Sequence, residues 1–240
     1  MLDTRNEVSS KFESTVSIGL PVFNSESTIK AAIESIIHQS FKNWVLIISD
    51  NNSSDQTVSI IEEFLIKDNR IFLYKQENNI GMYQNYEFVL KKSIGKGKYF
   101  HWLASDDTRS INFLEENITF LEENNDYIAS CSIKFFGSKD SYQKNNKNFK
   151  IDQETSLERI NFLLSNIWQS HSIYFSVMRI EAIKNCQYLA EHYLGQDWII
   201  NIFLAKNGKI ALQKNSHIII GEYGISRINP FDPFRLIWIE

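Results

Sequence analysis

Two adjacent carboxylates, Asp106 and Asp107, directly follow the apolar run Tyr99–Ala104, where a buried strand should end in a loop. Like charges side by side repel each other and are costly to bury, so a cation often offsets them. Carboxylate oxygens suit Mg²⁺ and Mn²⁺, and such ions commonly hold substrate phosphates as well. A helix cap is the alternative for an isolated Asp-Asp pair. The pair therefore indicates either a metal and phosphate site or the start of a helix.

A third carboxylate, Asp50, follows the apolar run Val45–Ser49, which we interpret as another buried strand. In open α/β sheets, ligands bind at the carboxyl ends of the parallel strands, so Asp50 should lie near Asp106 and Asp107. The usual glycine-rich phosphate loops are missing, and the chain has only 9 glycines. A diphosphate bound at this edge would therefore need a metal ion to offset its charge.

The elements that must position these carboxylates alternate between short apolar runs and amphipathic stretches, which is typical of a parallel sheet covered by helices. The predicted strands are Val16–Leu20, ended by Pro21, then Val45–Ser49, Ile71–Tyr74, a strand from Tyr99, and Tyr127–Phe136. The first predicted helix begins at about Ile29, behind the cap candidates Asn24 and Ser25, and the second follows the polar turn Asp50–Asp55. Two more begin at about Met82 and near Ile111.

The polar, Asn- and Lys-rich stretch 137–153 divides the chain, because it cannot bury much surface and reads as a loop. Beyond it we expect helices over Ser156–Asn166, Arg179–Leu189 and Gly195–Lys206, a strand over Ile173–Met178, and short strands near Ile210 and Ile218. At 240 residues, the chain can form one large α/β domain.

Composition excludes several classes of protein. A net charge of −4 argues against a general nucleic-acid binder. Cys131 and Cys186 lack metal-ligand spacing, so we expect two reduced thiols in a reducing compartment. Residues 1–14 are polar and do not resemble a signal peptide, and no apolar run approaches the length of a membrane span.

The sequence from Val16 to Thr57, VSIGLPVFNSESTIKAAIESIIHQSFKNWVLIISDNNSSDQT, resembles the opening of a family 2 glycosyltransferase of the GT-A type. Later stretches keep the order of that family: Asn79-Ile80-Gly81, YFHWLASDD, Phe113-Leu114-Glu115 and GQDWIINIFLAKNGKI from Gly195. The resemblance covers residues 15–225. It implies a GT-A fold, in which a Rossmann-like, mostly parallel sheet is flanked by helices and followed by a smaller acceptor-side half.

Several donor-binding residues are implied by the resemblance. Pro21, Phe23 and Asn24 would line the nucleotide base, and Asp50 would contact it. Asn51 stands where a second Asp is common, and Gly81 belongs to the second matched stretch.

The family's D-x-D motif is incomplete, because Ala104 stands where the first acid is often found. The resemblance then assigns Asp106 to a ribose or metal contact and favours Asp107 as the ligand of Mn²⁺ or Mg²⁺. Asp197 corresponds to the family's general base. One positioned carboxylate suffices for direct displacement with inversion, so no second catalytic carboxylate is needed.

We therefore expect an inverting, metal-dependent, hexosyltransferase-type enzyme that moves a sugar from a nucleoside-diphosphate sugar, with a UDP-sugar favoured, to a glycan or lipid-linked acceptor in bacterial surface polysaccharide synthesis. Trp168, His171 and Trp198 are candidates for the acceptor side. A catalytically silent sugar-nucleotide-binding subunit is the alternative from another class. A nucleotidyltransferase is disfavoured because it would need a glycine-rich basic loop after the first strand.

This interpretation divides the chain into a tail (1–14), a nucleotide-sugar-binding half (15–136), a polar loop (137–153), an acceptor-side half (154–227) and a C-terminal segment (228–240). The apolar stretch Phe234–Ile239 would pack on the body or across a homodimer, and a peripheral membrane contact stays open. The expected location is the cytoplasm, including the inner face of the membrane.

Overall fold

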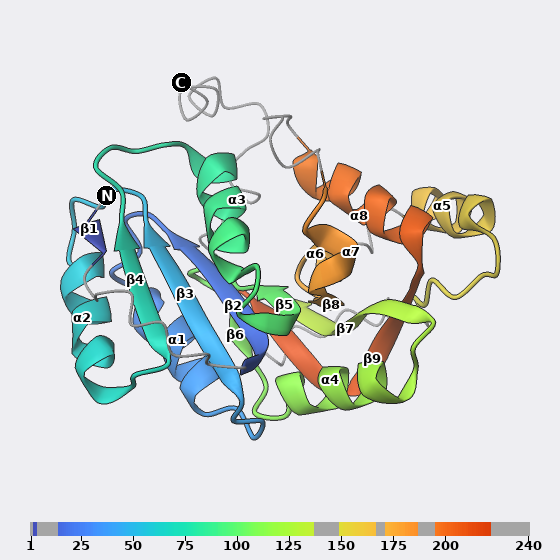
Figure 1. Cartoon of the computed structure of the whole chain (residues 1–240), viewed down its shortest axis with the longest axis horizontal. Helices are drawn as coiled ribbons and strands as arrows, with labels where there is room; N and C mark the ends of the chain where they lie inside the picture. The colour runs from blue at the N-terminus through green and yellow to red at the C-terminus, as the bar shows by residue number, and fades with distance from the viewer. Residues whose placement is uncertain (1, 4–13, 137–148, 167–170, 187–194, 222–240) are drawn as a thin grey trace.

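The computed structural model describes residues 2–3, 14–136, 149–166, 171–186 and 195–221. Within them, one mixed sheet has the strand order β1-β4-β3-β2-β5-β8-β7-β9-β6, and helices cover both of its faces (Figure 1). The strands are β1 (Leu2–Asp3), β2 (Ser14–Val22), β3 (Trp44–Asp50), β4 (Ile71–Lys75), β5 (Gly97–Trp102), β6 (Thr108–Arg109), β7 (Tyr127–Phe136), β8 (Val177–Arg179) and β9 (Lys209–Ile220). The helices are α1 (Ile29–Ile37), α2 (Thr57–Lys67), α3 (Met82–Ser93), α4 (Phe113–Glu123), α5 (Ser156–Ser165), α6 (His171–Tyr174), α7 (Ile180–Ile183) and α8 (Gln196–Asn207).

The first half of the chain follows the predicted pattern. β4, β3, β2 and β5 are parallel neighbours, and every residue of β3 is buried. A parallel sheet needs both faces covered, which explains why its strands read as continuous apolar runs. Their carboxyl ends therefore meet at one edge of the sheet.

We expected Pro21 to end the first strand, but β2 continues through Val22. Pro21 lies opposite Ser49 of β3, and the pairing of β2 with β5 stops at Gly19. The carbonyl of Val22 accepts a hydrogen bond from Asn51 on the β3 side, so the backbone of Pro21 faces the other way. Since no strand pairs with β2 there, the missing N–H of proline leaves no acceptor unsatisfied.

The expected cap of the first helix also differs in detail. Thr28, rather than Asn24 or Ser25, flanks α1 at its N-terminus. The carbonyl of Ser25 accepts hydrogen bonds from the backbone N–H groups of Thr28 and Ile29.

The second half departs more from the sequence interpretation. The strand expected over Ile173–Met178 is replaced by the short helix α6 followed by β8. The strands expected near Ile210 and Ile218 are one strand, β9, which pairs with β7 in parallel with a register shift between Ser132 and Ile133. The helix expected over Arg179–Leu189 appears as α7, and residues 187–189 lie outside the described part.

Part of the predicted polar loop is buried. Phe149 is 5% exposed and Ile151 is fully buried, and Ile151 forms a two-way backbone hydrogen-bonded bridge with Ile210. Residues 137–148 of that loop lie outside the described residues. The mean composition of the stretch concealed two apolar side chains that the second half uses as core.

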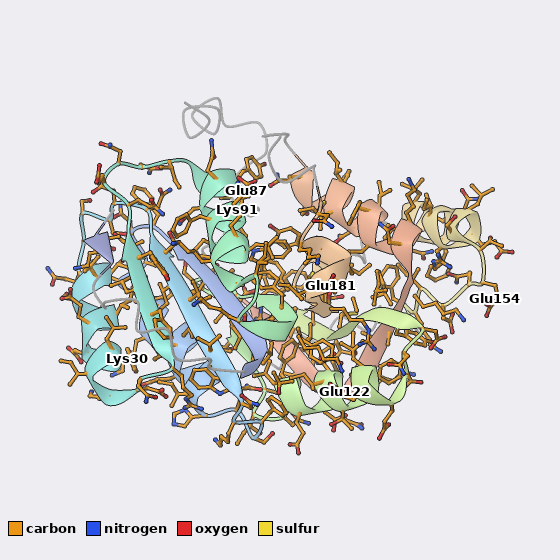
Figure 2. The ribbon with its side chains drawn as sticks, viewed as in Figure 1. Lys30, Glu87, Lys91, Glu122, Glu154 and Glu181 are labelled. Carbon is orange, nitrogen blue, oxygen red and sulfur yellow. The ribbon has the colours of Figure 1, made fainter. Side chains whose placement is uncertain are left out.

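Charged side chains gather on the outside of the molecule, as the labelled residues of Figure 2 illustrate. Glu87 and Lys91 form an ion pair one turn apart on α3, and Lys98 pairs with Glu122 of α4. Exposed pairs of this kind contribute little to stability. No helix in the described part of the chain has the length and apolar character needed to cross a bilayer.

Candidate active site

The donor edge, which we define as the loops after β2, β3 and β5, is held together by side chains that bridge one loop to another. The carboxamide oxygen of Asn24 accepts a hydrogen bond from the backbone of Ser54 at 2.9 Å, and the hydroxyls of Ser25 and Ser105 lie 2.8 Å apart. These bonds join the loop after β2 to the two others. The edge is therefore a rigid surface and not three independent loops.

Asp50 lies at the end of β3 and is 2% exposed. One carboxylate oxygen accepts a hydrogen bond from the backbone N–H of Ser53 at 3.1 Å, whereas the buried Oδ1 has no hydrogen-bond partner within the described structure. A buried acceptor without a donor is costly, so such an atom commonly marks the place of a ligand N–H or a water. Asp50 thus has the geometry of a binding residue.

Asn51, which we expected to contact the donor, is buried and engaged in the fold. Its carboxamide oxygen accepts from the backbone N–H of Ile80 at 2.8 Å, and its nitrogen donates to Asn79 at 2.8 Å. These bonds tie β3 to the turn before α3. Gly81 ends this turn with φ of 86°, a left-handed conformation that favours glycine. Asn51 thus shapes the edge through its side-chain hydrogen bonds, and Gly81 through its backbone conformation.

The base-lining candidates also lie on this edge. Pro21 is buried within β2, Phe23 is half-buried and Asn24 is exposed with φ of 46°. The left-handed conformation of Asn24 is one that asparagine tolerates better than most residues.

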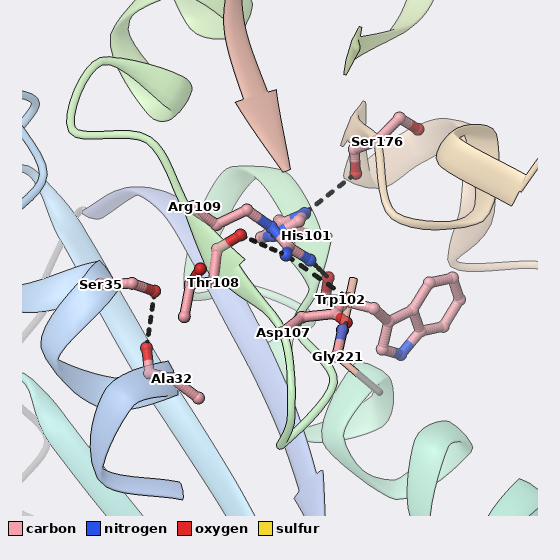
Figure 3. Close-up of polar contacts among 9 residues, drawn as sticks. All are labelled: Ala32, Ser35, His101, Trp102, Asp107, Thr108, Arg109, Ser176 and Gly221. Atoms are coloured by element: carbon pink, nitrogen blue, oxygen red, sulfur yellow. Dashed lines mark hydrogen bonds and ion pairs between the residues drawn. The ribbon is translucent and has the colours of Figure 1, made fainter. Parts of the chain in front are cut away.

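The acid pair follows β5, and its two members differ. Asp106 is half-buried, whereas Asp107 is 2% exposed. Asp107 Oδ1 accepts a hydrogen bond from the backbone N–H of Gly221 at 3.0 Å, and Oδ2 lies 3.5 Å from the guanidinium of Arg109 (Figure 3). Burial raises the pKa of Asp107 to about 6, although Arg109 and the Gly221 N–H act in the opposite direction.

Arg109 was not among the residues that the sequence singled out. Its side chain is fully buried, and its Nε donates to Nε2 of His101 at 3.0 Å. Nε2 is therefore the acceptor, which leaves Nδ1 of a neutral imidazole to donate to the carbonyl of Ser176 at 3.3 Å. Burial and the adjacent Arg109 lower the pKa of His101 well below its usual value. A signal for Arg109 was present, because residues 107 and 109 share one face of an extended chain.

An aromatic cluster, which we define as Tyr86, Trp102 and Tyr174, joins α3 and β5 of the first half to α6 of the second half. Trp102 and Tyr174 stack with ring centroids 4.8 Å apart, and Tyr86 lies 5.8 Å from Tyr174. The Trp102 indole donates to the carbonyl of Tyr86 at 3.2 Å. Burial raises the pKa of Tyr174 well above its usual value, and the neighbouring Tyr86 and Asp197 add to this effect. Asp197 is therefore close enough to Tyr174, and the acid pair close enough to Tyr86, for their charges to act on the same cluster.

Asp197 lies in the first turn of α8, directly after Gly195-Gln196. Burial raises the pKa of Asp197, while hydrogen bonds from backbone N–H groups at the helix start lower it. The helix N-terminus favours a negative charge, so the carboxylate is stabilised where it stands. A half-buried carboxylate with a raised pKa can accept a proton from a hydroxyl group at its exposed side.

The acceptor-side candidates are described only in part. Trp198 follows Asp197 and is 41% exposed. His171 begins α6, but its side chain is not described, and Trp168 lies outside the described residues. No group of three or more His, Cys, Asp or Glu side chains that could hold a metal ion occurs in the described part of the chain.

Comparison with known proteins shows which family the chain resembles. The model of glycosyl transferase family 2 matches residues 17–186. The UDP-Glc:alpha-D-GlcNAc-diphosphoundecaprenol beta-1,3-glucosyltransferase WfgD of Escherichia coli is 37% identical over 110 residues, which cover 46% of this chain and 42% of that protein. The chain spans less than half the length of the first curated relatives that it matches.

Solved structures agree on the fold. The structure of Staphylococcus aureus TarS 1–349 in complex with UDP-GlcNAc superposes with a TM-score of 0.70 at 18% identity, covering 91% of this chain and 62% of the other. The mannosyltransferase PcManGT of Pyrobaculum calidifontis, solved with GDP-Man and Mn²⁺, gives 0.65 at 10% identity, covering 90% and 59%. The expected GT-A fold is confirmed, and because the family match spans well over half of its residues, the chain belongs to glycosyl transferase family 2.

Proposed function

We propose that this family 2 glycosyltransferase transfers a hexose from a nucleoside-diphosphate sugar to a glycan or lipid-linked acceptor, with inversion, in surface polysaccharide synthesis. The observation that carries the proposal is the buried, unpartnered Oδ1 of Asp50 at the donor edge. The half-buried Asp197 and the acid pair both act electrostatically on the aromatic cluster, Asp197 on Tyr174 and the acid pair on Tyr86. The proposal keeps the donor site in 15–136 and the acceptor-side half in 154–227.

A UDP-sugar is the favoured donor. The N3–H of uracil is a single donor that one carboxylate oxygen can accept, which suits Asp50 Oδ1. Pro21 and Phe23 would then line the ring, and Asn51 and Gly81 would hold the adjacent turn. The complex of TarS with UDP-GlcNAc supports this choice only through the shared fold, and the complex of PcManGT with GDP-Man shows that the fold accepts another base.

Transfer requires three bond changes. The acceptor hydroxyl gives its proton to the Asp197 carboxylate, its oxygen bonds to the anomeric carbon, and the bond from that carbon to the diphosphate breaks. The electron pair leaves with the diphosphate, and because the acceptor oxygen attacks the opposite face of the sugar, the anomeric configuration inverts. The helix N-terminus at Asp197 keeps the base ionised in the resting enzyme.

The resemblance implies Mn²⁺ or Mg²⁺, and the two acids fit such an ion differently. Asp106 is half-buried at the donor edge, and a cation of this type is often bound by one or two carboxylates together with substrate phosphates. Asp107 suits the metal-ligand role that we expected less well, because it is 2% exposed and lies 3.5 Å from the guanidinium of Arg109, whose positive charge would repel a cation. When bound, the ion would offset the negative charge of the diphosphate leaving group.

The acceptor is inferred from a relative. The E. coli WfgD protein acts on a diphosphoundecaprenol-linked sugar, as its name states. An acceptor of that kind would bring this chain to the inner face of the membrane, with Trp198, Trp168 and His171 as candidates for sugar contacts. Trp198 supports this role because its indole is partly exposed beside Asp197.

A thermal-shift screen of UDP-, GDP- and ADP-sugars, each with and without Mn²⁺, tests the donor. A ligand present at a hundredfold its Kd should stabilise the protein by about 2.7 kcal/mol. We expect stabilisation by UDP-sugars, and its loss in Asp50→Ala. The absence of stabilisation by any nucleotide sugar would refute the donor site.

Product analysis then separates an enzyme from a silent binding subunit. NMR of the anomeric carbon should show inversion relative to the donor sugar. Donor binding without transfer to any lipid-diphosphate sugar would favour the silent subunit instead.

A further inference from the structure

The fully buried Arg109 is the most unusual charged residue of the donor edge. Its guanidinium donates to His101, to the carbonyls of Thr108 and Trp102, and lies 3.5 Å from Asp107 (Figure 3). Removing a guanidinium from water is costly unless a carboxylate and hydrogen-bond acceptors surround it. Asp107 supplies the negative charge, and His101 and the two carbonyls supply acceptors.

Each of the two carboxylate oxygens of Asp107 has a partner within the protein. Arg109 holds one oxygen, and the backbone N–H of Gly221 holds the other at 3.0 Å. Each oxygen keeps a second lone pair, but Asp107 is only 2% exposed. A cation bound there would have to share an oxygen with the Gly221 N–H or with the buried guanidinium, whose positive charge would repel it. Asp106 is half-buried, so it is the more accessible carboxylate of the pair.

Gly221 also limits the position of Asp106. A Cβ atom built on Gly221 would lie 2.5 Å from Asp106 Oδ2 and would overlap the Asp106 carbonyl oxygen. The backbone beyond β9 therefore packs directly on the Asp106 residue, and only a glycine permits this approach. Gly221, which is more than a hundred positions from Asp106 in the chain, thus limits where the Asp106 carboxylate can lie.

We propose that Asp107 is a positioning residue and not a metal ligand, and that Asp107, Arg109 and Gly221 form a latch that holds Asp106 as the acid of the pair that faces the donor. The proposal rests on the donor site proposed above. It predicts that the charge of Asp107 matters to the buried Arg109 and hardly at all to the cation. Asp106 carries the cation dependence alone.

Charge matching between Asp107 and Arg109 is tested by a double-mutant cycle. Asp107→Asn should lower Tm, because it leaves the guanidinium buried without a counter-charge. Asp107→Asn with Arg109→Met should recover most of that Tm. Lys98→Met, which removes an exposed ion pair with Glu122, is the control and should change Tm little.

Calorimetric titration of UDP, with and without Mn²⁺, then distinguishes a positioning role of Asp107 from a metal-ligand role. In the double variant, the oxygen of Asn at position 107 can still accept the hydrogen bond from Gly221, which packs on Asp106. We therefore expect the Mn²⁺-dependent affinity for UDP to stay within about threefold of wild type. Asp106→Asn should keep the wild-type Tm and lose more than tenfold in that affinity. A double variant with wild-type Tm but without Mn²⁺-dependent binding would overturn the proposal.

A steric pair of variants tests the positioning itself. Gly221→Ala should weaken UDP binding at least tenfold by displacing Asp106, although Gly221 carries no ligand group. Gly208→Ala is the matched control, because a Cβ there would overlap the Ile128 side chain at the opposite end of β9. It should lower Tm without changing the Kd for UDP. Equal UDP affinity in both variants would contradict the latch.

The wild-type protein gives a test that does not depend on the folding of any variant. Hydrogen exchange of the Gly221 amide should be slow, and it should stay slow when Mg²⁺ and UDP are added. Faster exchange on ligand binding would mean that Asp107 leaves Gly221 for the cation, and would refute the proposal. If wild type binds no nucleotide, the donor site fails, while the Tm cycle still decides whether Arg109 and Asp107 are coupled.

Discussion

The donor edge and the start of α8 differ in how their polar groups are held. At the donor edge, side chains bridge separate loops, as in the hydrogen bond that Asn51 accepts from the Ile80 N–H and the contact of Ser25 with Ser105. Asp197 instead depends on backbone N–H groups of its own helix. The first arrangement suits binding of a ligand of fixed shape, since its geometry exists before the ligand arrives. The second suits a carboxylate that must change its protonation state.

The largest effect on this comparison is expected from a variant that removes the base at position 197 and keeps the shape of its side chain. Asp197→Asn should lower kcat by about 10²–10⁴-fold, since a general base typically contributes that much. The Kd of the donor should change little, because the donor edge is untouched. Transfer kinetics and calorimetry on the same preparation check both parts. Wild-type turnover in this variant would remove Asp197 from the chemistry.

At the donor edge, we expect a loss of donor affinity with a much smaller loss of turnover. Asp50→Ala removes the buried acceptor, and a hydrogen bond to a charged group is worth about 1.5–3 kcal/mol, or about 10- to 150-fold in donor Kd. The turnover of the saturated enzyme should fall much less than in Asp197→Asn. Asp50→Asn is the control, because the amide keeps one acceptor oxygen and nearly the same shape. Calorimetry with UDP that shows equal affinity in all three proteins would exclude Asp50.

The acid side of the pH profile sharpens the assignment of the base. Burial raises the pKa of Asp197 above its usual 3.8, so the ionised base is lost at a higher pH than for an exposed aspartate. kcat/KM should therefore fall about tenfold per pH unit below that raised pKa. The profile of kcat/KM from pH 4 to 8 measures the limb. A limb that persists unchanged in the residual activity of Asp197→Asn would belong to another group.

The smallest effect is expected from a residue that shapes the edge without binding. Asn51→Ala loses the bonds to Ile80 and Asn79, each worth about 0.5–1.5 kcal/mol of stability. Donor Kd should rise less than tenfold, through a looser turn before α3. Asn43→Ala, which loses one exposed bond to Thr15, is the matched control. Thermal unfolding and calorimetry distinguish this indirect role from a direct donor contact, which would cost as much affinity as Asp50→Ala.

The sequence by itself determined most of the first half. β3 and β4 agree with the predicted strands to within one residue at each end, and β7 agrees at both ends. Each of these strands is a short, largely apolar run between polar turns, so local information suffices. The same strand ends placed Asp50 and the acid pair on one edge, because parallel strands end on the same side of a sheet.

Only the tertiary structure decided the second half and the environment of the acid pair. β8 lies antiparallel between β5 and β7, which is a non-local pairing. The strand that we expected over Ile173–Met178 is therefore a short helix followed by a three-residue strand. Spacing placed Asp107 and Arg109 on one face, yet nothing in it identified His101 or Gly221 as their partners. Whether a carboxylate faces solvent or an interior guanidinium depends on which distant segments the fold brings to it, and periodicity carries no information about such contacts.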